Sequence, residues 1–418
     1  MVPGKSGSPL KICFFNRSYA PDLGATGQLL AELAEDLVRH YNCQISIVAG
    51  LPTSSAKGVW KSAWRGLGFR REVIRGVTIF WALGTTFQPI RFAARTTNYM
   101  TYFLSACLAS LCIPKQDVVV ALTDPPIIGL AALLAARRSG ARFVFLCEDV
   151  FPEVTAVLED FQSKTVHRFL RSVSRFLIRR ADAVVALGET MQDRLITEKG
   201  ALREKVTVIH NWVDCRAIVP APKKNPFSVS QGLCEAFVVT HSGNVGLSQN
   251  LDVLLDAAEK LRSYPEIVFA ITGDGVRRQP LEARARARQL SNVRFFPYQP
   301  KGSLVDSFAT ADVFVISLKN GLSGYIVPSK LYGILAAGRP FIAAVEEDCE
   351  AAIIARQHDC GLCAQVGNPN DLVDRILTLY RNRTLARRLG ENARRLALQF
   401  DRTRAVEAYF RLFCGFKR

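Results

Sequence analysis

Short apolar runs alternate with helical patterns along most of the chain. Residues 118–122 and 143–146 are continuous apolar runs, and residues 28–40 and 128–138 between such runs have helical spacing. Strands that are apolar throughout and separated by helices are typical of a parallel sheet covered on both faces. The pattern therefore predicts an α/β protein. The apolar runs of the first half are residues 11–15, 44–48, 77–81, 118–122, 143–146, 183–187 and 206–209.

The alternation stops at residues 220–231, PAPKKNPFSVSQ, and then restarts. A stretch rich in Pro, Ser and Lys is typical of a linker. We therefore expect two doubly wound, Rossmann-like α/β domains facing a central cleft, with ligands at the carboxyl ends of the strands. The expected boundaries are an N-terminal domain at 1–216, a linker at 217–231, a C-terminal domain at 232–395, and a C-terminal helix at 396–418 that packs back on the N-terminal domain. The later runs are residues 236–240, 267–272, 293–296, 313–316 and 341–343, with helices expected at 251–262, 280–289, 330–337 and 378–413, the last broken near Asp401.

The charge balance narrows the class of partner. The 54 Lys and Arg against 37 Asp and Glu give a net charge of +17. Such a balance favours a nucleic acid, an anionic membrane surface or phosphorylated substrates as partners. Eleven cysteines without a regular framework suit a reducing compartment. The pair Cys360 and Cys363, with only His358 nearby, is either part of a metal site or two small residues on an edge strand.

Two segments bear on membrane contact. Residues 99–113 are apolar, but a spanning helix needs about twenty residues, so we expect a buried or interfacial helix and no transmembrane anchor. The polar start of the chain has no secretory signal pattern. Residues 164–180 carry six Lys and Arg and no acidic residue. This amphipathic segment either lies on anionic lipid or covers the sheet with its charges in water, and the two interpretations are compatible.

A strand, a glycine loop and a helix start follow one another near residue 330. The apolar run 313–316 precedes a loop containing Gly321 and Gly324, and Ser329 is placed to cap a helix that begins at Lys330. Free backbone N–H groups and the charge of Lys330 would make an anion site there. The alternative is an ordinary strand–helix unit with a solvated lysine.

Further glycine turns follow other predicted strands. Residues 21–27 contain Gly24 and Gly27, and residues 241–246 contain Gly243 and Asn244. Glycines allow close backbone approach, and the next helix offers its positive end to a phosphate. A third turn contains Gly273 and Asp274, and Asp274 either stabilises that turn or contacts a ligand. None of these turns is GxGxxG, which disfavours an NAD dehydrogenase.

Three carboxylates crowd the end of the run 143–146, namely Glu148, Asp149 and Glu153. Neighbouring carboxylates shift one another's proton affinity, which suits acid–base work on a hydroxyl. The alternative is a cluster that complements a helix N-terminus. Asp149 is the better catalytic candidate, with Glu153 second.

These motifs together resemble those of glycosyltransferase family 4, over residues 11–396. The glycine loop of the first half is accompanied by SGNVG at 242–246, GDG at 273–275, YQP at 298–300, AD at 311–312, PSKLY at 328–332 and AAGRP at 336–340. That family contains retaining, metal-independent enzymes with two Rossmann domains. Its bacterial exopolysaccharide, O-antigen and colanic-acid group has a similar D-x-x-P-E run, matched here by Asp149, Pro152 and Glu153.

The resemblance implies roles for the two domains. The C-terminal domain would bind a UDP- or GDP-sugar, with the diphosphate near Gly243 and Asn244. Ser329, Lys330 and Leu331 would add contacts from the helix start. The Gly24–Gly27 loop would close over the phosphates, and the N-terminal domain would hold a lipid-linked acceptor. Asp149 stands at a strand end where many relatives have histidine. No metal or other cofactor is expected, and the protein would be cytoplasmic and peripheral on the inner face of the membrane.

The sequence departs from the family pattern in the second half. Tyr325 and Gly333 stand where relatives have two glutamates eight residues apart, the second of which binds the ribose. Asn244 and Gln249 stand where many relatives have an arginine and a lysine. A carboxylate after the next strand, Glu346 or Glu350, could replace the missing one.

The expected function is transfer of a sugar from UDP- or GDP-sugar to a lipid-linked saccharide, in cell-surface polysaccharide synthesis. One alternative is an enzyme resembling a nucleotide-sugar epimerase. Another is a catalytically silent scaffold, given the missing glutamates. Binding of nucleic acid is disfavoured, because no known nucleic-acid-binding module is present and the basic residues are spread over both halves.

Overall fold

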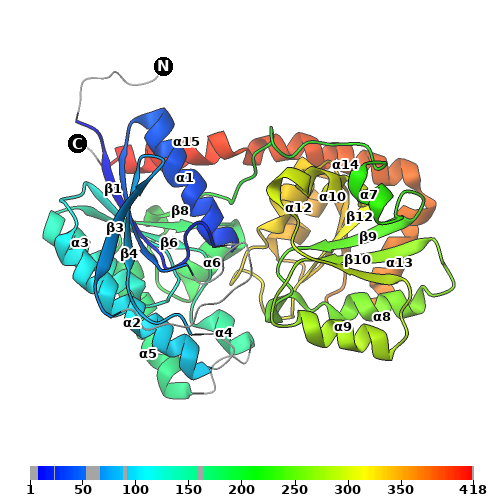
Figure 1. Ribbon diagram of the computed structural model, residues 1–418, viewed down its shortest axis with the longest axis horizontal. Coiled ribbons are helices and arrows are strands. Elements are labelled where there is room, and N and C mark those ends of the chain that lie inside the picture. The colour runs from blue at the N-terminus through cyan, green and yellow to red at the C-terminus, as the bar shows by residue number, and fades with distance from the viewer. Residues whose placement is uncertain (1–7, 23, 53–65, 88–91, 159–162, 417–418) are drawn as a thin grey trace. The chain divides into compact units, whose positions relative to one another are not determined.

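The computed structural model describes residues 8–22, 24–52, 66–87, 92–158 and 163–416, which divide into two compact units (Figure 1). The first unit comprises Met1–Leu187, Met191–Ile209 and Val406–Arg418. The second comprises Gly188–Thr190 and His210–Ala405. Each unit is built around its own sheet, so each can be described by itself.

Within the described residues, the first unit contains an eight-stranded sheet in the order β3-β4-β2-β1-β5-β6-β7-β8. All neighbouring strands are parallel except β3, which is antiparallel to β4. Its strands are β1 (Lys11–Phe15), β2 (Gln44–Gly50), β3 (Phe69–Ile74), β4 (Val77–Ala82), β5 (Val118–Ala121), β6 (Arg142–Cys147), β7 (Ala183–Ala186) and β8 (Val206–Val208). Its helices are α1 (Ala25–Tyr41), α2 (Phe92–Cys112), α3 (Ile128–Ser139), α4 (Glu153–Val157), α5 (Lys164–Arg180) and α6 (Glu189–Thr197).

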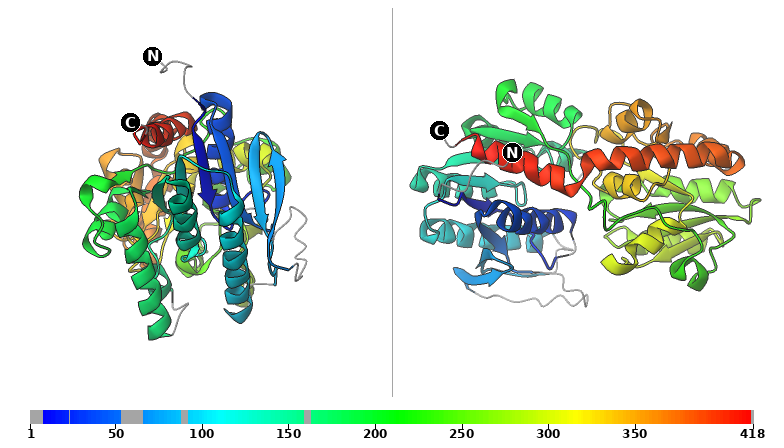
Figure 2. Two further views of the ribbon diagram at one scale, coloured as in Figure 1. Left: turned by 90° about the vertical axis from the view of Figure 1, so that its left-hand side faces the viewer. Right: turned by 90° about the horizontal axis from the view of Figure 1, so that it is seen from above.

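Periodic apolar side chains attach the helices of this unit to its sheet. In α1, Leu30, Leu33 and Leu37 recur every three or four residues and are buried, which is the pattern of a helix with one face on a core. Helices α2, α3 and α5 lie side by side (Figure 2, left). The order of the strands reverses at β1, so loops after β1 and β5 leave in opposite directions and form the usual ligand position of such a sheet.

The second unit has a six-stranded parallel sheet in its described residues, in the order β11-β10-β9-β12-β13-β14. The strand order reverses between β9 and β12, which places the expected ligand position at their carboxyl ends. Its strands are β9 (Phe237–Ser242), β10 (Ile267–Thr272), β11 (Val293–Phe296), β12 (Val313–Ser317), β13 (Phe341–Ala344) and β14 (Gly361–Ala364). Its helices are α7 (Pro226–Ser230), α8 (Asp252–Lys260), α9 (Arg278–Ala287), α10 (Leu304–Thr310), α11 (Lys330–Ala336), α12 (Glu350–Gln357), α13 (Pro369–Arg381) and α14 (Arg383–Ala397).

The predicted fold class, two Rossmann-like α/β domains, is confirmed by these two sheets. The apolar runs of the sequence coincide with the buried central strands, such as β5 and β12, in which every residue is buried. One strand was not predicted. The sequence of β3, FRREVI, is charged and largely exposed, because β3 is an edge strand of the sheet and has no core to cover.

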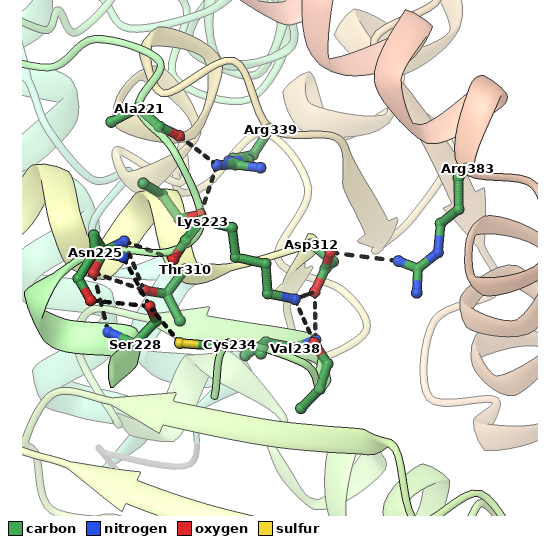
Figure 3. A network of polar contacts seen from close by, with 12 residues as sticks. Ala221, Lys223, Asn225, Ser228, Cys234, Val238, Thr310, Asp312, Arg339 and Arg383 are labelled. Carbon is green, nitrogen blue, oxygen red and sulfur yellow. Dashed lines mark hydrogen bonds and ion pairs between the residues drawn. The ribbon is translucent and has the colours of Figure 1, made fainter. Parts of the chain in front are cut away.

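Residues 217–231, whose composition predicts a linker, belong to the second unit and are tied to it by a polar network (Figure 3). Lys223 pairs with Asp312, and Asp312 also accepts a hydrogen bond from the Val238 amide at 2.7 Å. Asn225 caps α7 through the Ser228 amide at 3.0 Å. Arg339 donates to the carbonyl of Ala221 at 2.9 Å. The segment is therefore an ordered part of the second unit.

The C-terminal region is several helices rather than one. The expected break near Asp401 is confirmed by the turn before α15 (Arg402–Cys414), but a second break occurs at Asn382 between α13 and α14. Asn382 ends α13 and caps α14, because its side chain accepts from the Leu385 amide at 2.9 Å. The last part of α15 belongs to the first unit, where the Phe410 ring stacks on Tyr41 with 4.1 Å between the ring centroids.

The cysteine pair of the sequence lies at the edge of the second sheet. Cys360 precedes β14 and Cys363 lies within it. This strand is at the edge of the sheet, and both thiols are free. Among the described residues, no three His, Cys, Asp or Glu side chains are grouped so that they could hold a metal ion. Likewise, none of the described helices has both the length and the hydropathy needed to cross a bilayer.

Candidate functional site

The glycine turns after β9 and β10 interlock at the carboxyl edge of the second sheet. The Gly243 amide donates to the carbonyl of Thr272 at 2.9 Å, and the Val245 amide donates to that of Asp274 at 2.9 Å. Gly273 has φ of +137°, and a Cβ atom there would lie 1.8 Å from the Gly243 carbonyl oxygen. Only glycine fits this approach, so the turn residues predicted from the sequence are brought together here.

Asp274 supports the turn that contains it. Its carboxylate accepts a hydrogen bond from the amide of Gly275 at 2.8 Å. A short acidic side chain that bonds the following backbone is a common turn device. The structure therefore favours the turn-stabilising interpretation of Asp274 over a direct contact with a ligand.

Lys330 lies against the first of these turns. A Cβ atom placed on Gly243 would be 3.8 Å from the Lys330 Nζ, and that Nζ donates to the side-chain oxygen of Gln249. In the described part of the chain no carboxylate pairs with Lys330. Burial lowers the pKa of Lys330 to about 7, because the ammonium form is poorly solvated there. The Lys330 side chain is only part-buried, and an anion bound beside Nζ would favour the ammonium form.

His241 adds no second charge beside Lys330. Its ring is fully buried, and Nε2 lies 3.4 Å from the Asn244 carbonyl oxygen. Burial, and then the charge of Lys330, hold the pKa of His241 well below its ordinary value. The imidazole is therefore neutral near pH 7, and the positive potential of this edge comes from Lys330 and from backbone N–H groups.

The start of α11 differs from the sequence expectation. Ser329 precedes Lys330 as expected, but its side chain makes no capping hydrogen bond and its backbone is already helical. The predicted cap at Ser329 is therefore wrong. Leu331 is fully buried in the core, so only its backbone is available to a ligand. With seven residues, α11 has a small dipole, and Lys330 is the main source of positive charge.

Little space is available for a glutamate side chain at Gly333, one of the two positions where the family pattern has glutamate. A Cβ atom there would lie 3.0 Å from the ring of Phe308, a core residue, so a longer side chain would require the ring to move. Of the two substitutes considered, the Glu346 carboxylate accepts from the amides of Gly321 at 2.9 Å and Ser323 at 3.1 Å. Glu346 therefore holds the loop after β12. Glu350 lies at the start of α12, with its Oε1 3.4 Å from His210 Nδ1.

The glycine loop of the first unit leads directly into α1. Gly24 is the residue before the helix, and the helix begins at Ala25, three residues earlier than expected. A Cβ atom on Gly27 would lie 3.1 Å from the Tyr19 amide nitrogen, so this turn is tightly packed. Thr26 lies near Glu148 and acts to lower the pKa of its carboxyl group, so the loop lies close to the end of β6.

Asp149 has the environment of a proton-transfer group. It follows β6, and among the described residues no hydrogen bond or ion pair to its carboxylate is recorded. Burial, with a smaller contribution from Asp124, raises the pKa of Asp149 to about 7. Burial and the charge of Asp149 raise the pKa of Glu148 to about 8. A carboxyl group that titrates near neutral pH suits acid–base chemistry.

Glu153, the second catalytic candidate, has ionic partners. It is buried at the start of α4, where it pairs with Lys199 and, at 3.1 Å, with Arg171. The Lys199 ammonium also donates to the Phe151 carbonyl at 2.6 Å. This arrangement favours the alternative in which Glu153 stabilises the turn and helix after Asp149, and it leaves Asp149 as the catalytic candidate.

Sequence reasoning missed two residues at the edge that carries Asp149. Arg17 follows β1 and Asp124 follows β5, the two strands at the reversal point, and their side chains pair at 3.2 Å. The signal was present, because each residue comes two or three positions after an apolar strand end, as Asp149 does. Gln249 was noticed only as a departure from the family pattern, and it is the partner of Lys330.

Comparison with known proteins follows the same division into two parts. The family described as "Glycosyl transferase 4-like domain" matches residues 24–212, and the family "Glycosyl transferases group 1" matches residues 230–396. WcaI of Escherichia coli K12, which carries the name of a colanic acid biosynthesis glycosyl transferase, is 26% identical over 91% of this chain and 96% of its own length. WbjE of Pseudomonas aeruginosa, which carries the name of a glycosyltransferase, is 28% identical over 59% of this chain and 62% of its own length.

A solved structure supports the fold. HepE of Anabaena, in complex with UDP and glucose, superposes with a TM-score of 0.71 at 16% identity, over 97% of this chain and 99% of HepE. At this identity the likeness concerns the fold alone. The two family matches, the two sheets and the placement of both glycine turns agree in their assignment: the chain belongs to the glycosyltransferases of the two-domain GT-B fold.

Proposed function

We propose that this protein transfers a sugar, with retention of the anomeric configuration, from UDP- or GDP-sugar to a lipid-linked saccharide during synthesis of a cell-surface polysaccharide. The observation that carries the proposal is Lys330, a part-buried lysine with no carboxylate partner among the described residues, beside the glycine turn at the reversal point of the second sheet. That position suits the diphosphate of a nucleotide sugar.

The chemistry explains why a cation belongs there. When the bond between the anomeric carbon and the diphosphate oxygen breaks, negative charge develops on the departing nucleoside diphosphate. Fixed positive charge and N–H groups aimed at that oxygen lower the barrier. Lys330 supplies the charge, and Gly243 and Asn244 are proposed to lie closest to the diphosphate. Because the Gly243 and Val245 amides already donate to Thr272 and Asp274, the amide proposed to meet the diphosphate in the turn after β9 is that of Asn244. Gly24 and Gly27 are proposed to contact the same donor.

Asp149 is proposed to act on the acceptor. Its pKa of about 7 leaves a substantial ionised fraction at neutral pH, and that form can accept a hydrogen bond from the attacking hydroxyl of the saccharide. The Arg17–Asp124 pair is proposed to position this edge of the sheet.

The acceptor class and the place of action follow from different observations. WcaI carries a name for colanic acid biosynthesis, which supports a surface polysaccharide as the product. HepE was solved with UDP and glucose, which supports a nucleotide sugar as the donor. The basic composition supports work at the inner membrane face, where lipid-linked acceptors carry anionic diphosphates.

The proposal includes no resident metal. Lys330 and the backbone amides take the place that a divalent cation would have at the leaving diphosphate, and the sequence has no Asp-x-Asp motif for such an ion. We expect transfer to persist in excess EDTA.

A silent scaffold is the second candidate, and Gly333 favours it, because no carboxylate stands where the family pattern has its ribose ligand. The test uses the purified chain with a panel of UDP- and GDP-sugars, with and without a lipid diphosphate saccharide. Release of nucleotide and a glycosylated lipid only when acceptor is present supports transfer. Conversion of the donor sugar without acceptor indicates an epimerase, and binding of neither nucleotide indicates a scaffold.

A further inference from the structure

Three neighbouring helices of the first unit form an outer layer without acidic residues. Helices α2, α3 and α5 lie side by side (Figure 2, left), and their sequences contain no Asp or Glu although the chain has 37. We call them the acid-free layer. Their cations are Arg95, Arg137, Arg138, Lys164, Arg168, Arg171, Arg175, Arg179 and Arg180. Because every charged side chain of these helices is positive, the layer presents a positive electrostatic potential to its surroundings.

The outer side of α2 is apolar. Met100, Leu104, Leu108 and Leu111 are 43–50% exposed and recur every three or four residues, so they share one face of the helix. The opposite face, with Tyr102, is buried. A helix that covers a sheet normally exposes polar side chains on this side, and a row of exposed leucines marks an interaction site.

The other two helices extend this apolar surface. Leu134 of α3 is 41% exposed, and Phe169 and Phe176 of α5 are 59% and 39% exposed. Only the C-terminal half of α5 is anchored, by Leu177 and Ile178. The interpretation in which the apolar side of α5 covers the sheet therefore holds for Leu177 and Ile178, whereas Phe169 and Phe176 are exposed.

Part of the positive charge around these apolar side chains has no carboxylate beside it among the described residues. Arg171 pairs with Glu153, and Arg175 donates to the carbonyl of Glu198. For Lys164, Arg168 and Arg179 no carboxylate partner occurs among the described residues. Long arginine and lysine stems can cover apolar surface while their charged ends reach phosphate groups. The combination has the composition of an interfacial membrane helix.

We propose that the acid-free layer is the surface by which this protein docks on an anionic phospholipid bilayer, with the leucines of α2 and Phe169 entering the headgroup region. The choice of lipid over a protein partner rests on charge complementarity: three helices whose sequences contain no acid, with exposed apolar side chains among cations, match anionic headgroups above acyl chains. The inference builds on the proposed function, because an acceptor anchored in lipid requires the enzyme at that surface.

The test measures binding of the full chain to vesicles of phosphatidylcholine, with and without phosphatidylglycerol, by cosedimentation. We expect binding that requires phosphatidylglycerol and weakens with salt. Arg168→Gln with Arg179→Gln should lower vesicle affinity roughly tenfold or more, and Leu104→Ser with Leu108→Ser should lower it by a similar factor. Matched controls in the second unit are Arg387→Gln with Arg388→Gln, and Val229→Ser with Leu398→Ser, which should leave it unchanged.

Several outcomes would overturn the inference. They are equal binding to both vesicle types, binding that survives both paired changes, and a dimer that the paired changes dissociate while vesicle binding persists. Binding of UDP and of GDP, measured on the same samples, separates the two hypotheses. Protein that binds either nucleotide but no vesicle disproves the docking surface alone, and protein that binds vesicles but no nucleotide disproves the proposed function alone.

Discussion

Lys330 connects donor binding to pH. Since burial lowers the pKa of Lys330 to about 7, its side chain is mostly neutral at pH 8 when no nucleotide is bound. A bound diphosphate favours the ammonium form, so UDP binding should take up close to one proton at pH 8 and much less at pH 6. Calorimetry in two buffers of different ionisation enthalpy measures this uptake. Its absence at pH 8 would show that Lys330 does not meet the diphosphate.

Asp149 should determine the acid limb of the rate profile. Its pKa of about 7 means that the ionised form is lost below neutral pH, so kcat should rise with pH up to about 7 and then level off. Asp149→Asn should remove this limb and lower kcat roughly 10²- to 10⁴-fold, while UDP affinity stays unchanged. Steady-state rates across pH provide the measurement.

A neighbouring variant controls for this interpretation. The charge of Asp124 contributes to the raised pKa of Asp149, so Asp124→Asn should shift the limb to lower pH without abolishing activity. If Asp149→Asn instead fails to fold, as judged by circular dichroism, then Asp149 is a structural residue and the catalytic assignment is wrong.

At the scale of single residues, sequence reasoning found positions more reliably than contacts. Gly243, Gly273 and Lys330 were predicted from strand–turn–helix order, which depends only on neighbouring residues. The missing cap at Ser329 and the Lys330–Gln249 contact depend on backbone angles and on residues 81 positions apart. Patterns of neighbouring residues in the sequence report neither backbone angles nor contacts between distant residues.

Among the elements, the interlocked glycine turns should be the most sensitive. Gly273→Ala would force a Cβ atom into the Gly243 carbonyl, so we expect a loss of about 3 kcal/mol or more of unfolding free energy. Urea denaturation measures the loss. Gly302→Ala is the matched control, because nothing lies within 4 Å of its added Cβ atom. Equal stability of the two variants would contradict the described turn geometry.

The ordered segment before β9 provides a second test at this scale. Asp312→Ala removes the acceptor shared by Lys223, Arg383 and the Val238 amide (Figure 3). Because these groups are partly exposed, we expect a loss of roughly 2 kcal/mol. Glu259→Ala, which removes two exposed pairs with Arg262 and Arg288, should cost less than about 1 kcal/mol. If Asp312→Ala costs no more than this control, residues 217–231 are a loose linker after all.

The elements that the sequence missed share a physical reason. Strand β3 is charged because it is an edge strand. Residues 217–231 are largely polar because hydrogen bonds attach them to the second unit alongside the apolar contacts of Ile218 and Phe227. Asn382 ends one helix and starts the next within an apolar pattern that continues across it. Hydrophobic periodicity reports burial, and these features depend on polar contacts.

For the molecule as a whole, membership in the GT-B glycosyltransferases assigns the second unit to the family "Glycosyl transferases group 1", and the proposed function gives that unit the nucleotide sugar. The alternation of strands and helices predicted both sheets, because burial on two faces leaves a continuous apolar pattern in each strand. The donor base, the sugar and the acceptor depend on a few polar contacts, and the sequence pattern does not encode them.

The most direct test of the account is a calorimetric titration of UDP and GDP into the purified chain in excess EDTA. We expect one site for one of the two nucleotides, with affinity reduced about tenfold or more by Lys330→Met and unchanged by Lys260→Met on the exposed side of α8. Failure of both nucleotides to bind, or equal affinity of the wild type and Lys330→Met, would contradict the claim that Lys330 and the adjoining turn grip a diphosphate.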